Sequence, residues 1–99
     1  MAQIRIDLQE GFRHDAVTIR VNGKEVLNTD VSTRLQTGFA GSVEVDVPEP
    51  SATIEIALPD RDVSTTIPLH LGSAVYVGVS LTPDSKIEHR LSQEPFGYV

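Results

Sequence analysis

The sequence predicts an all-β protein, an antiparallel two-sheet β-sandwich of seven to eight short strands joined by Greek-key connections. Three observations predict it. Apolar and polar residues alternate with a period of two through most of the chain, as in strands that bury one face. Turn-forming residues recur at the spacing of about eight to twelve positions that is typical of sandwiches. No segment keeps the 3.6-residue period of a helix. A flattened β-barrel is the alternative architecture.

A hairpin over residues 17–26 is the element around which the rest of the predicted fold is organised. Its first arm, VTIRV, turns Val17, Ile19 and Val21 inward. Asn22-Gly23 follows at once, and this dipeptide best supplies the two positive-φ residues of a tight two-residue turn. The register of both arms is then set, because a slip of one residue would invert every side chain.

The segments around this hairpin continue the alternation. Residues 3–8 form the first strand, and residues 10–15, which contain a glycine and no period, form a loop. The return arm, residues 24–29, has adjacent apolar residues, so we expect a bulge or bend near Asn28. The two glycines of residues 37–41 indicate a connection that crosses between the sheets.

The second half of the chain predicts further strands and the turns between them. We expect strands over residues 42–47, 51–58, 63–71, 74–81 and 86–91, separated by Pro48-Glu49-Pro50, by turns over residues 59–62 and 82–85, and by Gly72-Ser73. Residues 74–81 are the most apolar and are predicted to be a central strand. Pro68 has no N–H to donate, so its strand should lie at a sheet edge or contain a bulge.

Composition limits the classes of function. The 99 residues suffice for a single domain over residues 1–99, with residues 92–99 as a C-terminal tail. The chain has no cysteine, which removes disulfides and thiolate metal sites and fits a cytoplasmic protein. The net charge of -6 argues against nucleic acid as a partner. No apolar run approaches the roughly 20 residues of a membrane span.

The negative charge lies in the middle of the chain. Residues 44–62 carry six acidic side chains against Arg61 alone, a net charge of -5. Glu44, Asp46 and Glu55 are therefore candidate interaction residues that would meet a basic protein partner. The alternative is a solvated strand face that serves solubility and edge protection.

No motif for catalysis, cofactors or metals is present. The three histidines, His14, His70 and His89, have none of the spacings of a preassembled metal site. No GxSxG elbow accompanies the serines. His89 is expected on the inward face between Ile87 and Leu91, where a histidine needs a polar partner or a place near the end of the sheet. We therefore predict no enzyme, no cofactor and no metal site.

The tail holds two further candidate interaction residues. Phe96 and Tyr98 flank a glycine after Pro95, so an extended tail would present both rings on one side. The rings either plug an open end of the sandwich or lie across an edge, or they dock on another subunit or partner.

The order "VTIRVNGKEV", then "GSVEVDVPEPSATIEIALPD", then "STTIPLHLGSAVYVGVSL" resembles the small transthyretin-like and carboxypeptidase-regulatory-like sandwiches. The chain is also similar to small bacterial proteins that end in an "EPFGY"-type tail. The resemblance covers most of the chain and implies a binding or structural role, because such modules are mostly non-catalytic.

Three functions follow from these observations, in this order. The first is a non-catalytic interaction or structural module, self-associating through a sheet edge or the tail, or binding another protein. The second is a domain that binds a small molecule or a carbohydrate. The third is a hydrolase assembled across loops, for which a deep pocket that joins a histidine to carboxylates would be required.

Overall fold

The computed structural model describes residues 2–34, 36–48, 50–70 and 75–97. These residues form the strands β1 (Ala2–Leu8), β2 (Asp15–Val21), β3 (Lys24–Val31), β4 (Gly41–Val47), β5 (Ser51–Leu58), β6 (Val63–His70), β7 (Val75–Leu81) and β8 (Ile87–Ser92), with a short 3₁₀ helix, η1 (Pro59–Arg61). The strand ends within the described residues fall within two residues of the predicted ones, whereas the predicted ends at Leu71 and Ala74 lie outside the described residues. No helix in this part of the chain is long and apolar enough to span a membrane.

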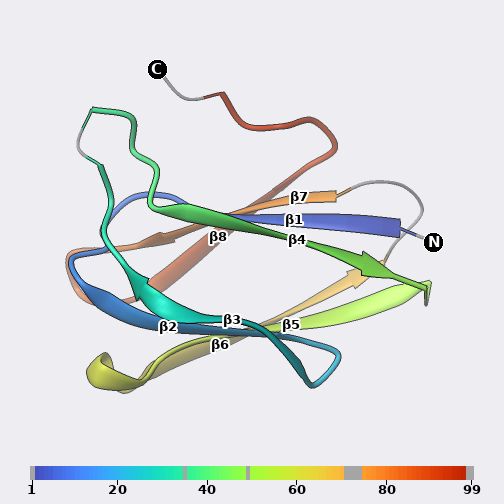
Figure 1. The fold of residues 1–99 in the computed structure, drawn as a ribbon, viewed down its shortest axis with the longest axis horizontal. Coiled ribbons are helices and arrows are strands. Elements are labelled where there is room, and N and C mark those ends of the chain that lie inside the picture. The colour runs from blue at the N-terminus through green and yellow to red at the C-terminus, as the bar shows by residue number, and fades with distance from the viewer. Residues whose placement is uncertain (1, 35, 49, 71–74, 98–99) are drawn as a thin grey trace.

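The strands form two stacked sheets (Figure 1). One sheet has the order β4-β1-β7-β8 and the other β3-β2-β5-β6. Each sheet ends in two edge strands, so the sandwich is confirmed and the barrel alternative is wrong. The chain changes sheet between β1 and β2, β3 and β4, β4 and β5, and β6 and β7. The crossing expected at residues 37–41 is the one between β3 and β4, whereas Gly72-Ser73 lies outside the described residues.

The hairpin adopts the predicted turn. Asn22 has φ 52° and Gly23 has φ 80°, the positive pair that a type I′ turn requires. Asn22 also extends the pairing of β2 with β5, because its N–H donates to the carbonyl of Thr53 at 2.9 Å and its Oδ1 accepts from the Thr53 N–H at 2.9 Å. One residue therefore closes the hairpin and attaches it to the next strand.

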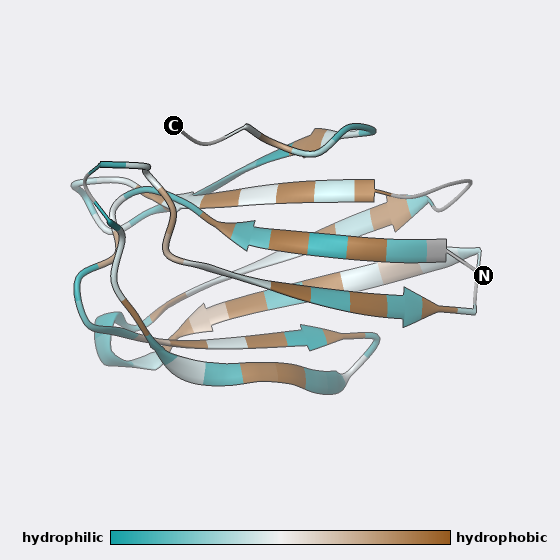
Figure 2. Cartoon of the chain, turned by 45° about the horizontal axis from the view of Figure 1, so that its top comes forward, coloured by the Kyte–Doolittle hydropathy of each residue, from teal (hydrophilic) through white to brown (hydrophobic). Residues whose placement is uncertain are grey.

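The alternation of side chains produces the core, and Figure 2 shows it as brown and teal bands along the strands. The buried apolar residues come from both sheets and one loop: Ile4, Ile6, Leu8, Phe12, Val17, Ile19, Val21, Val31, Val47, Ala52, Ile54, Ile56, Leu58, Ile67, Leu69, Val77, Val79 and Leu81. The loop residue is Phe12, which lies between β1 and β2 and is buried with the core.

The order of the strands within the sheets confirms two of the predictions. β7 is central, as its apolar sequence predicted, and Pro68 lies on the edge strand β6. Neighbouring strands run antiparallel except β1 and β7, which pair in parallel. No tight turn joins these two strands, so nothing local sets their relative direction.

The irregularity in the return arm of the hairpin lies at Val26 and not at Asn28. Ile19 pairs with Leu27 and Arg20 pairs with Glu25, which leaves Val26 as the extra residue of a bulge. Two residues of a bulge oppose one residue of the partner strand. The bulge therefore lets Val26 and Leu27, although adjacent, both pack against the core.

Candidate functional site

The free edge of β8 is the most exposed apolar feature of the sandwich. β8 ends its sheet and pairs only with β7 among the described strands, over a continuous register from Tyr76 with Ser92 to Leu81 with Ile87. Leu91 is 52% exposed and is the one large apolar side chain in the described structure that is exposed to this degree. The edge thus combines unpaired backbone groups with an apolar side chain.

The other edge strands are protected against pairing. β3 contains the bulge at Val26, β6 contains Pro68, and β4 carries Glu44 and Asp46 and ends at Val47, directly before Pro48. Bulges, prolines and charges are the usual means by which an edge avoids pairing with another chain. β8 contains no proline and no shift in register, and its only such protection is the pair of charged side chains Glu88 and Arg90.

His89 lies in the middle of β8 and is exposed. It pairs with Val79 and so shares the inward face, as predicted. The expectation that it faces the core fails: like Leu91 on the same face it is exposed, and of these inward residues of β8 only Ile87 packs against the core. His14 and His70 are also exposed, and the described residues contain no cluster of histidine, aspartate and glutamate that fits a metal ion.

The C-terminal tail folds back over the outer face of β8, above the upper sheet in Figure 1. The Phe96 ring stacks on the Arg90 guanidinium, with the guanidinium carbon 4.5 Å from the ring centroid. The turn into the tail is closed at Ser92, whose hydroxyl donates to the Glu94 carbonyl at 2.8 Å and accepts from the Glu94 N–H at 3.0 Å. Phe96 therefore contacts its own chain, and Tyr98 lies outside the described residues.

A polar groove of about 470 Å³ lies between this tail and the loop that precedes β4. Gln9, Gly38, Gly78, Ser80 and Gly97 line it, with Glu10, Glu88 and Arg90 at its borders. A Cβ at Gly78 would lie 2.7 Å from the Gln9 amide oxygen, so any larger residue there would displace the Gln9 side chain.

Two polar residues, Asp7 of β1 and Gln9 directly after it, are buried near this groove, which the alternation did not predict. Asp7 and Gln9 both point away from the core, yet only 2% and 5% of their surfaces are accessible. The Arg5 Nε donates to Asp7 Oδ1 at 2.9 Å, so the Asp7 carboxylate is paired. Side-chain direction was predictable from the sequence, but the burial of this outer face was not.

The acidic candidates do not form one surface. Glu44 and Asp46 lie on the outer face of β4, and Arg5 approaches Glu44 to 3.7 Å across the strand pair. Glu55 lies on β5 in the opposite sheet and pairs with Arg20 across the β2–β5 register. A basic partner would therefore have to reach both sides of the sandwich to contact all three.

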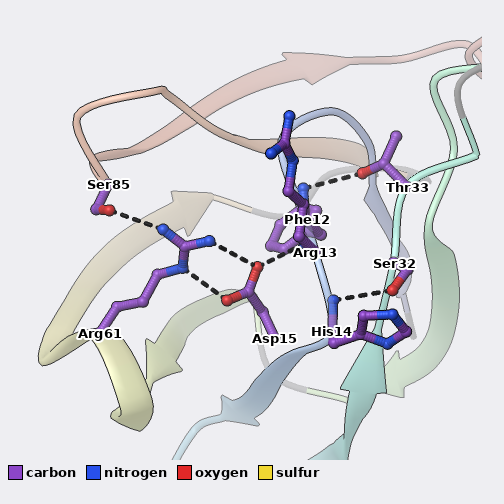
Figure 3. Close-up of polar contacts among 8 residues, drawn as sticks. All are labelled: Phe12, Arg13, His14, Asp15, Ser32, Thr33, Arg61 and Ser85. Atoms are coloured by element: carbon purple, nitrogen blue, oxygen red, sulfur yellow. Dashed lines mark hydrogen bonds and ion pairs between the residues drawn. The ribbon is translucent and has the colours of Figure 1, made fainter.

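Asp15 and Arg61 form an ion pair that the sequence did not indicate (Figure 3). Arg61 Nε donates to Asp15 Oδ1 at 2.6 Å and a second guanidinium nitrogen donates to Oδ2 at 3.2 Å. The third nitrogen donates to the Ser85 hydroxyl at 2.8 Å. The pair connects the start of β2, the η1 turn and the β7–β8 turn, and it fixes the end of the sandwich from which β8 begins.

The surroundings of Asp15 lower its pKa below the ordinary value of 3.8. Burial by itself raises the pKa, but hydrogen bonds from Arg61 and from the Arg13 N–H at 2.7 Å, together with the positive charge of Arg61, outweigh it. The carboxylate is thus held ionised as a structural group.

The groove is the place where the described structure brings His89 and Ser80 near the carboxylates of Glu10 and Glu88. His89 borders the groove with Glu88, but the register turns its imidazole to the other face, away from Ser80. No protein-family model matches the sequence, and no curated protein matches it at a significant level.

Proposed function

We propose that the protein is a non-catalytic interaction module that associates with a protein strand through the free edge of β8. The observation that carries this proposal is the half-exposed Leu91 on β8, an edge strand that contains neither a proline nor a bulge. An added strand would satisfy the unpaired backbone groups of β8, and its side chains would cover Leu91, as in β-strand addition. The resemblance to transthyretin-like sandwiches, which implies a binding or structural role, points the same way.

The experiment replaces His89 by a photo-reactive amino acid in cells that express the protein, and then irradiates the cells. We expect a crosslinked protein adduct at this position, and none when the same side chain replaces Thr66, an exposed residue of the proline-protected edge strand β6. Leu91→Lys should abolish the adduct, because a lysine at the edge opposes strand pairing. The absence of any adduct at His89, or an adduct that Leu91→Lys leaves unchanged, would refute the proposal.

A polar small molecule in the groove above Gly78 is the second candidate function. The volume of about 470 Å³ is in the range of about 300 to 1,000 Å³ that ligand pockets occupy. Amide, hydroxyl, carboxylate and guanidinium groups surround it, which suits a hydroxylated ligand such as a sugar. Titration with a panel of mono- and disaccharides, followed by NMR, tests this: amide shifts at Gly78 and Ser80 would favour it, and an unchanged spectrum would exclude those ligands.

A further inference from the structure

We infer that the partner strand at the β8 edge is β8 of a second copy of this chain, paired antiparallel in a register centred on His89. This inference rests on the proposed function and specifies its partner. It rests on the order of charged and apolar residues in the β8 sequence IEHRL. When two copies of this segment run antiparallel, the acidic residue of each can face the basic residue of the other, and the apolar residues can face each other.

The geometry of antiparallel pairing limits the registers to a few. Along an edge strand, backbone N–H and C=O groups point alternately toward the neighbour within the sheet and toward the free side. In a symmetric antiparallel pair, residues whose backbone groups point to the free side must lie opposite residues of the same kind. Such residues occur at every second position, so the numbers of two opposite residues add up to an even number. The two-fold axis therefore passes through a residue and not between two residues. The central residue is therefore Glu88, His89, Arg90 or Leu91.

Charge selects one of these four registers. A centre at Glu88 would place the two Glu88 side chains opposite each other, and a centre at Arg90 would do the same for the two arginines. Like charges directly opposite one another are unfavourable across a strand pair. A centre at Leu91 would leave Glu88 without a partner within β8, because its opposite position lies in the tail, beyond the end of the strand at Ser92.

In the register centred on His89, each charged residue of β8 faces an opposite charge and each apolar residue faces an apolar one. Glu88 of each copy faces Arg90 of the other, and Ile87 of each copy faces Leu91 of the other. The two charge pairs lie on the outer face of the joined sheet, and the two apolar pairs lie on the inward face. Ile87 is already packed against the core, so it extends that core to the exposed Leu91 side chain of the second copy.

The same charges can be reversed without disturbing β7. Glu88 lies opposite Ser80 and Arg90 lies opposite Gly78 within the sheet, so Glu88→Arg or Arg90→Glu places no like charge directly opposite on β7. Both positions are exposed. Arg90→Glu also removes the stacking on Phe96, for which Arg90→Gln is the matched control.

The test is sedimentation equilibrium of the purified chain over roughly 10 μM to 1 mM, because a single strand pair buries less than a standard interface. We expect wild type to dimerise, and Glu88→Arg and Arg90→Glu to weaken self-association by about tenfold or more each. An equimolar mixture of these two variants should dimerise again, since the first supplies two arginines and the second two glutamates. The double variant Glu88→Arg/Arg90→Glu should likewise recover, and circular dichroism should show that all are folded.

The outcomes separate this inference from the proposed function. Wild type that stays monomeric, or single variants that dimerise as tightly as wild type, would overturn the pairing of β8 with its own copy. If the photo-reactive side chain at His89 then captures a different protein, the proposal that β8 binds a protein strand is retained, and only the identity of the partner changes. If it captures nothing, both proposals fail.

Discussion

Replacement of Gly11 by alanine should destabilise the protein strongly, because backbone occupies the space that a side chain would need. Gly11 has φ +94°, and an added Cβ would lie 1.8 Å from the Leu81 carbonyl oxygen at the end of β7. That oxygen cannot retreat freely, since the Leu81 N–H donates to the Glu10 carbonyl at 2.8 Å and holds the two segments together. The substitution therefore has to separate the loop from β7.

The magnitude follows from two contributions. A left-handed backbone conformation costs an alanine about 1 to 2 kcal/mol, and loss of the Glu10–Leu81 bond with the repacking around it costs about 2 to 3 kcal/mol more. We expect the free energy of unfolding to fall by about 3 to 5 kcal/mol, measured by urea denaturation with circular dichroism.

Gly23→Ala is the matched control for the backbone conformation. Gly23 has φ +80° and nothing lies within 4 Å of its added Cβ, so this variant should lose only about 1 to 2 kcal/mol. Equal losses for the two variants would refute the steric argument, because they would show that the contact with Leu81 contributes nothing.

Three further predictions concern the ion pair, the tail and the edge of β6. Asp15→Asn should lower Tm by about 5 °C or more relative to Asp60→Asn, an exposed control. Since the folded pKa of Asp15 lies below 3.8, the ionised carboxylate contributes its full stability well above pH 3.8 and loses it as the pH falls through the folded pKa. A difference in Tm between the two variants that persists in strong acid would contradict this account. Phe96→Ala should cost about 1 kcal/mol through the lost stacking on Arg90, whereas loss of self-association at unchanged Tm would show that the ring docks on a partner. Pro68→Thr should increase concentration-dependent light scattering by removing the protection of the β6 edge, and scattering equal to that of wild type would count against that role.

Local chemistry made much of the fold predictable. Asn22-Gly23 specified its turn because few dipeptides tolerate two positive φ angles, and Pro68 specified an edge because it lacks an N–H. The two-residue period assigned side chains to the correct face of most strands, although His89 and Leu91 on the inward face of β8 are exposed. These features depend on neighbours in the sequence, and so they can be inferred without the fold.

The features that the sequence did not predict depend on distant segments. Asp7 and Gln9 are buried on an outer face, and Asp15 meets Arg61 from a turn 46 positions away. His89 is exposed although it lies on the inward face of β8, and Glu55 is separated from Glu44 because the chain changes sheet between them. A period of two gives the face on which a side chain lies, but not what covers that face.

The central claim is that the β8 edge joins two copies of the chain, and amide NMR spectra recorded across a dilution series test it most directly. We predict concentration-dependent shifts concentrated in residues 87–92, with weaker changes in neighbouring β7. The amides of the edge strands β3, β4 and β6 should stay constant. Shifts that map to one of those three strands, or spectra that do not change with concentration, would contradict the claim.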